Sequence, residues 1–176
     1  ALPSHDAFET PLGKIPLAKQ LIQTILPLPD VEIRDDAHQE EHCLEVQLPF
    51  LQEILKDFEI LPALVGKVSL KNFSGFLDIL LDDPLNLLLL STDLSHFLSY
   101  TEAQIMDEKT AQAIESLEAE KILPEHACGV HPLQGLLHHA RIQEWKVQRL
   151  GLCNSGDTAS SKDRVVGYGA WAFNKS

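Results

Sequence analysis

Apolar residues repeat along much of the chain with the spacing of a helix. Leucines between positions 40 and 56 recur at intervals of four, three and four residues, which predicts a helix over residues 40–56. Pro49 stands inside this pattern and lacks a backbone N–H, so we expect a kink or a break near Gln47. The same spacing predicts helices over residues 15–26, 70–81, 101–117 and 132–145, with Thr101 as the cap of its helix.

Short apolar runs bounded by turn residues predict strands between these helices. Residues 86–90, Asn-Leu-Leu-Leu-Leu, follow an Asp-Asp-Pro turn and have the composition of a strand that is buried on both faces, as in a parallel sheet. Further strands are predicted over residues 31–33, 58–65, 146–152 and 164–173, the last two joined by a turn over residues 154–163. Gly167 and Gly169 indicate a close backbone approach or a bulge in the last strand.

This alternation of strands and helices predicts an α/β fold with a central, mostly parallel sheet flanked by helices. The sequence contains no internal repeat, low-complexity segment or linker, so we expect a single domain over residues 1–176.

Composition narrows the classes of partner. The hydrophobic fraction of 44% and charged fraction of 23% are ordinary for a soluble globular protein. A formal net charge of −12 argues against nucleic acid and anionic membrane partners. No apolar stretch approaches the roughly 20 residues of a membrane span. The three cysteines are widely spaced, which favours a reducing, cytoplasmic compartment over a disulfide scaffold.

The chain opens on Ala1 and its single methionine is Met106. We therefore expect either a processed N-terminus or a fragment of a longer protein.

Polar residues gather where the predicted strand over residues 86–90 ends. Asp93 and His96 are three residues apart there, and ligands of open α/β sheets bind outside the carboxyl ends of the strands. Such a pair is a candidate for proton transfer. The alternative is that Asp93 caps the next helix and His96 lies on a loop.

A second motif, His38-Gln-Glu-Glu-His42, matches the pattern H-x-x-E-H. On one helix face, His38 and His42 would be zinc ligands and Glu41 the general base of a metallopeptidase. The alternative is a charged helix N-terminus, where the helix dipole favours acidic residues.

A third motif places Cys128 three residues before His131, in a loop that precedes a predicted helix. A thiolate there could be a metal ligand or a nucleophile, and the alternative is a small structural cysteine beside a turn glycine. Further along the chain, Asn154 and Ser155 either line a pocket or form a turn.

Taken together, these segments resemble the Memo family, whose bacterial members are described as AmmeMemoRadiSam system protein B. The resemblance runs in collinear order over essentially the whole chain. It is carried by residues 8–13 (Phe-Glu-Thr-Pro-Leu-Gly), 41–50, 62–66, 91–96 (Ser-Thr-Asp-Leu-Ser-His), 127–129 (Ala-Cys-Gly), 154–158 (Asn-Ser-Gly-Asp-Thr) and 166–170.

The resemblance implies a fold like that of the class III extradiol dioxygenases and a metal cleft built from two histidines and a cysteine. Cys128 matches the ligand cysteine, and His96 matches the acid/base histidine, with Asp93 orienting it. The other pocket positions that the resemblance implies are Glu41, His42 and His131. Family members carry both ligand histidines in a portion that would precede Ala1, so we expect this chain to be the C-terminal portion of the family domain.

Two imidazoles and a thiolate suit copper or iron, with zinc less favoured. The expected function is therefore a metal-dependent redox enzyme that acts on a small molecule or a peptide, with partners from the AmmeMemoRadiSam system. The first alternative is a non-catalytic adaptor module that binds peptides or proteins. The second is a zinc metallopeptidase that uses His38, Glu41 and His42.

Overall fold

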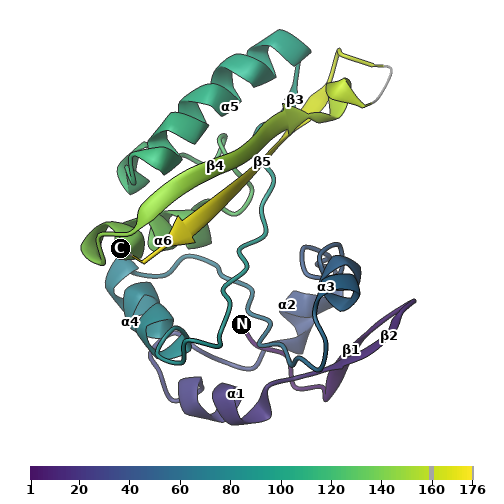
Figure 1. Cartoon of the computed structure of the whole chain (residues 1–176), viewed down its shortest axis with the longest axis vertical. Helices are drawn as coiled ribbons and strands as arrows, with labels where there is room; N and C mark the ends of the chain where they lie inside the picture. The colour runs from purple at the N-terminus through teal and green to yellow at the C-terminus, as the bar shows by residue number, and fades with distance from the viewer. Residues whose placement is uncertain (159–160, 176) are drawn as a thin grey trace. The chain divides into compact units, whose positions relative to one another are not determined.

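The computed structural model describes residues 1–158 and 161–175 (Figure 1). These residues form two compact units. The first comprises Ala1–Val68 and Gly75–Ser91, and the second comprises Ser69–Ser74 and Thr92–Ser176.

The first unit begins with an antiparallel hairpin. Strand β1 (Ala7–Thr10) pairs with β2 (Gly13–Pro16), and Gly13 has a φ of 123°, which an L side chain rarely adopts. Three short helices follow the hairpin: α1 (Lys19–Ile25), α2 (Asp35–Gln39) and α3 (Leu48–Ile54). The core of this unit contains Phe8, Ile15, Leu17 and Leu48.

The helices of this unit are shorter than their apolar patterns predict. The prediction of a helix from residue 15 is wrong at its start, because Ile15 packs into the core from β2 and α1 begins at Lys19. The predicted break near Gln47 is confirmed, since Gln47 is the N-cap of α3 and Pro49 follows in its first turn. Residues 43–47 form turns, so the continuous helix predicted over residues 40–56 is wrong.

The strands predicted over residues 31–33, 58–65 and 86–90 are also wrong. The first two regions contribute only isolated parallel bridges, Leu2 with Ile33 and Leu17 with Ile60. Residues 86–90 lie outside every strand, and Leu87 and Leu89 are 76% and 50% exposed. An apolar run becomes a buried strand only where neighbouring strands pair with it, and in the described residues these runs have no such ladder.

The second unit contains a three-stranded antiparallel sheet in the order β3–β5–β4. The long strands β4 (Lys146–Asn154) and β5 (Val165–Asn174) pair along their length, and β3 (His96–Leu98) pairs with the start of β5. Both predicted C-terminal strands are thereby confirmed, and the register shift between Arg149 and Gly151 is a bulge on β4. The turn predicted over residues 154–163 contains a 3-10 helix, η2 (Ser155–Asp157), and its residues 159–160 lie outside the described residues.

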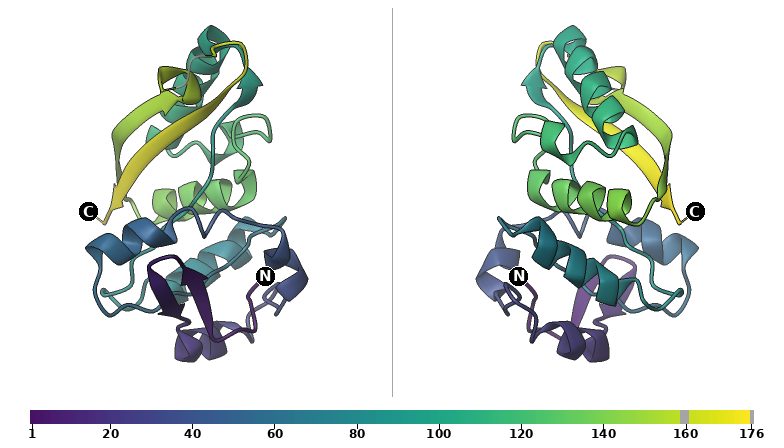
Figure 2. Two further views of the ribbon diagram at one scale, coloured as in Figure 1. Left: turned by 90° about the vertical axis from the view of Figure 1, so that its right-hand side faces the viewer. Right: turned by 90° about the vertical axis from the view of Figure 1, so that its left-hand side faces the viewer.

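Helices pack against this sheet. Helix α5 (Tyr100–Glu115) runs along the ribbon of β4 and β5, as both views of Figure 2 show. Helix α6 (Val130–Ile142) contacts η1 (Ala119–Lys121). Helix α4 (Leu70–Leu80) has residues 70–74 in the second unit and its remaining residues in the first. The helices predicted over residues 70–81, 101–117 and 132–145 are thus confirmed within a few residues at each end.

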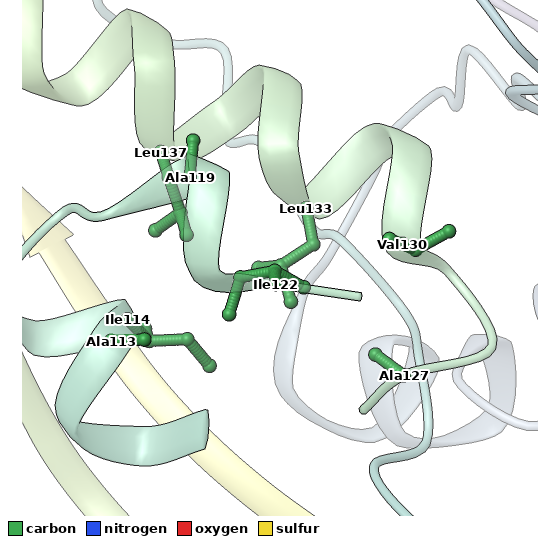
Figure 3. Close-up of a cluster of buried hydrophobic side chains, with 8 residues drawn as sticks. All are labelled: Ala113, Ile114, Ala119, Ile122, Ala127, Val130, Leu133 and Leu137. Atoms are coloured by element: carbon green, nitrogen blue, oxygen red, sulfur yellow. The ribbon is translucent and has the colours of Figure 1, made fainter. Parts of the chain in front are cut away.

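The main core of the second unit lies between these helices and the sheet. Figure 3 shows side chains of α5, η1 and α6 gathered in one cluster. Val147 of β4 and the two aromatic residues Trp171 and Phe173 of β5 pack against it. The buried members of the cluster are Ala113, Ile114, Ala119, Ile122, Ala127, Val130, Leu133 and Leu137.

The chain is therefore a mixed α/β protein, as predicted. The central, mostly parallel sheet expected from the dioxygenase resemblance is not confirmed, because all strand ladders in the described residues are antiparallel. The strands predicted over residues 31–33, 58–65 and 86–90, which such a sheet would need, form at most isolated parallel bridges in the described residues. None of the helices in residues 1–158 and 161–175 combines the length and the apolar character that a bilayer crossing requires.

Helix α5 begins with a capping box at Ser99, one turn before the sequence pattern becomes apolar. Glu102 accepts hydrogen bonds from the backbone N–H and the hydroxyl of Ser99, so Thr101 is not the cap that the sequence predicts.

We expect Ser99→Ala to lower the free energy of unfolding by about 1 kcal/mol, the usual loss for a removed cap. Thr101→Ala is the matched control and is expected to change it by less than about 0.5 kcal/mol. Urea unfolding of both variants measures the difference, and equal effects at the two positions would contradict the assignment of Ser99 as the cap.

Candidate functional site

Cys128 lies at the end of a loop, one residue before Gly129, the N-cap of α6. Its exposed sulfur accepts a hydrogen bond from the backbone N–H of Asp93 at 3.3 Å and lies 3.3 Å from Thr92 Oγ1. Two backbone hydrogen bonds join the same segments. The N–H of Cys128 donates to Asp93 O at 3.3 Å, and the N–H of Gly129 donates to Thr92 Oγ1 at 2.8 Å. Two segments that are 35 residues apart in sequence therefore meet at the sulfur.

Gly129 is required for this close approach. A Cβ atom at position 129 would lie 2.8 Å from Thr92 Oγ1, well inside van der Waals contact. The structure thus explains the glycine of the Ala-Cys-Gly motif, because a residue without a side chain lets the cysteine loop contact Thr92.

Asp93 and His96 come from the segment that leads into β3. His96 Nε2 lies 3.7 Å from Asp93 Oδ2, an ion-pair distance that is longer than a direct hydrogen bond. His96 begins β3 and pairs with Val166, so the alternative that places it on a loop is wrong. The alternative that Asp93 caps α5 is also wrong, because Ser99 holds that place. The structure therefore brings Cys128, Asp93 and His96 into one neighbourhood of the second unit.

Glu41 and His42 belong to the first unit and lie close to each other. Glu41 Oε1 accepts the backbone N–H of His42 at 2.8 Å and that of Cys43 at 3.1 Å, which holds the pKa of Glu41 below its usual value. The His42 ring is exposed, and its Nδ1 lies 3.8 Å from Glu41 Oε1.

The helical H-x-x-E-H arrangement is not formed. Helix α2 ends at Gln39, so His38 is helical while Glu41 and His42 follow the helix. His38 is also buried, with Nε2 3.2 Å from the carbonyl oxygen of Ala1, and burial lowers its pKa. The one-face geometry on which the zinc-peptidase hypothesis depends is therefore absent from this segment.

The remaining predicted residues stabilise local structure. Asn154 is buried, and its Oδ1 accepts the N–H of Gly156 at 2.9 Å to cap η2. Ser155 Oγ accepts the N–H of Val166 at 3.1 Å, so both side chains hold the turn between β4 and β5. His131 is half-buried in the first turn of α6, three residues after Cys128.

Two residues at the site escaped the sequence analysis. Thr92 lies against the sulfur of Cys128, and nothing in its sequence context marks it apart from the neighbouring serines. Asp107 is buried on α5, where it interrupts a helical stripe formed by Ala103, Ala111 and Ile114. A lone carboxyl on an apolar stripe is a signal that the sequence does contain.

The donor set of this cluster does not match a complete metal site. Among residues 1–158 and 161–175, no three histidine, cysteine or acidic side chains converge in the manner of a metal site. Cys128 offers one suitable thiol, and Asp93 presents its backbone N–H rather than its carboxylate to that sulfur. The side chains of the described cluster do not by themselves complete a metal centre.

Comparison with known proteins gives a consistent set of similarities. The sequence model of a family described as Memo-like protein matches residues 1–172. A protein of Aquifex aeolicus named "MEMO1 family protein" is 35% identical over 94% of this chain and 66% of its own length. Proteins of the same name from Metallosphaera sedula and Aeropyrum pernix are 30% and 32% identical, each over 94% of this chain and 64% of their own length. The chain spans about two thirds of the length of these curated relatives.

Proposed function

Because the chain belongs to the Memo family, we propose that it contributes the cysteine of a metal-binding cleft and that the protein is a metal-dependent redox enzyme. One observation supports this above all: the exposed sulfur of Cys128 accepts the backbone N–H of Asp93, a residue whose carboxylate lies 3.7 Å from the ring of His96. The further metal ligands would have to come from groups outside this cluster.

The chemistry of the donor favours copper or iron. A cysteine thiolate is a good ligand for soft and borderline metals, among them copper, iron and zinc. Zinc has no redox chemistry of its own, which makes it the weaker candidate for an oxidoreductase. When bound, a copper or iron ion would supply the electron transfer.

The chain's own residues have separate tasks in this proposal. His96 holds or moves a proton at Nε2, and the carboxylate of Asp93 at 3.7 Å orients the ring for that task. The N–H of Asp93 and the Thr92 hydroxyl fix the position of the sulfur. Glu41 and His42 stay predictions from the sequence, as do a small-molecule or peptide substrate and partners from the AmmeMemoRadiSam system.

We expect purified protein that has been supplied with copper or iron to retain more of either metal than the variant Cys128→Ala retains. The variant should lose most of the bound metal, because it lacks the thiolate that acts as a ligand in this proposal. Elemental analysis after gel filtration measures the metal content. Cys153→Ala is the matched control, since Cys153 is a second exposed cysteine that lies on β4, and it should keep the metal.

The opposite outcome is equally informative. Protein that holds no metal, or that holds it equally well as Cys128→Ala, would contradict the redox proposal. That result would favour the alternative function, a non-catalytic module that binds peptides or proteins and tolerates the loss of Cys128.

A further inference from the structure

Asp107 is a buried acidic residue in the middle of α5. The residue is only 2% exposed, and its Oδ1 accepts the backbone N–H of Ser95 at 3.0 Å. Its other oxygen, Oδ2, is buried and has no hydrogen-bond partner within the described part of the chain. Burial raises the pKa of this carboxyl group. An acidic residue that is unfavourable in its surroundings calls for a specific reason to be there.

Strand β5 leaves room for this carboxyl group at Gly167. A Cβ atom at position 167 would lie 2.0 Å from Asp107 Oδ2, so any side chain there would collide with it. The backbone of Gly167 also forms hydrogen bonds with the segment that contains Ser95. Its oxygen accepts the N–H of Leu94 at 2.9 Å, and its N–H donates to Ser95 O at 2.8 Å.

The segment over residues 92–96 is therefore fastened from two sides. The β5 backbone holds it at Leu94 and Ser95, and the α5 carboxyl group holds it at the Ser95 N–H. The same five residues include Thr92 and Asp93, which contact the sulfur of Cys128, and also His96. Any shift of Ser95 would move the Asp93 N–H, which is two residues away along the backbone.

We propose that Asp107 is the positioning residue of this site: by accepting the Ser95 N–H, it fixes the segment that holds Asp93 against Cys128 Sγ. This inference rests on the proposed function only for the importance of Cys128. The carboxyl group acts through the backbone N–H of Ser95.

Amide hydrogen exchange of residues 93–95 tests the inference without a metal or an activity assay. Asp107→Leu has a similar shape but no acceptor, so the Ser95 and Asp93 amides should exchange at least about tenfold faster, as local opening requires. Asp107→Asn keeps an acceptor oxygen and should restore the wild-type rates.

Thr110→Val is the matched control on the same helix. Thr110 is buried, and its hydroxyl donates to Met106 O within α5, so this substitution changes a buried polar group of the same helix without removing a hydrogen bond to the segment. Its Asp93 and Ser95 amides should exchange as in the wild type. Should Asp107→Leu fail to fold, Asp107→Ala removes the acceptor without filling the space.

Three results would overturn the inference. The first is wild-type exchange at Ser95 and Asp93 in the variants that lack the acceptor. The second is equal acceleration along β4, or in Thr110→Val, which would show a general loss of stability. The third is failure of both Asp107→Leu and Asp107→Ala to fold while Thr110→Val folds. Unchanged exchange together with an intact metal signal would remove the positioning role alone, and the converse pair of results would remove the metal proposal alone.

Discussion

Replacing Leu137 with alanine is expected to lower the free energy of unfolding by about 2–5 kcal/mol. Leu137 is 0% exposed and belongs to the cluster of α5, η1 and α6 side chains in Figure 3. Alanine would leave a cavity among branched neighbours such as Ile114 and Ile122. These residues come from different elements, so no single backbone shift can close the space.

Chemical denaturation of the Leu137→Ala variant measures this loss. Ile142→Ala is the matched control, because Ile142 ends the same helix and is 58% exposed. The control is expected to change the free energy of unfolding by less than about 0.5 kcal/mol. A loss below about 1 kcal/mol at Leu137 would mean that the core is not packed as described.

Adding a single methyl group at Gly135 is expected to destabilise the protein by up to about 2 kcal/mol. A Cβ atom there would lie 2.2 Å from Cδ1 of Phe73, a buried ring on the first turn of α4. Alanine gains about 1 kcal/mol over glycine in a helix interior. Overpacking of this severity costs about 1–3 kcal/mol or more, and we expect the collision to outweigh the gain.

Two further variants separate the collision from helix propensity. Gly75 also lies inside a helix, but nothing lies within 4 Å of its built Cβ. Gly75→Ala should therefore stabilise the protein by up to about 1 kcal/mol, the opposite sign to Gly135→Ala. In a double-mutant cycle, Phe73→Leu should recover part of the Gly135→Ala loss. Additive effects of the two substitutions would contradict the contact.

Helices and strands that are specified by local sequence signals could be predicted from the sequence. Helices α4, α5 and α6 and strands β4 and β5 follow from apolar periodicity and flanking turn residues alone. The helical spacing of Ile15 misleads because a local β-hairpin competes for the same residues. The Leu-rich run over residues 86–90 misleads because an apolar run specifies burial, whereas a strand also needs a partner for its backbone groups.

The site shows the same division between local and long-range information. Asp93, His96 and Cys128 could each be singled out from the sequence, because each lies in a short polar or reactive motif. Their convergence depends on backbone hydrogen bonds between segments 35 residues apart, which no local pattern contains. The H-x-x-E-H motif does not form a zinc-peptidase arrangement, because the helix ends between its two histidines. The motif itself gives no sign of where the helix ends.

The unpaired leucines that follow α4 have a consequence for the protein in concentrated solution. Leu85, Leu87 and Leu89 are all exposed, in a segment whose backbone belongs to no ladder. Such a segment can pair with a strand of another molecule, so we expect it to promote aggregation at high protein concentration. Asp82, Asp83 and Pro84 stand directly before it, where natural sequences place the charges and prolines that act as gatekeepers.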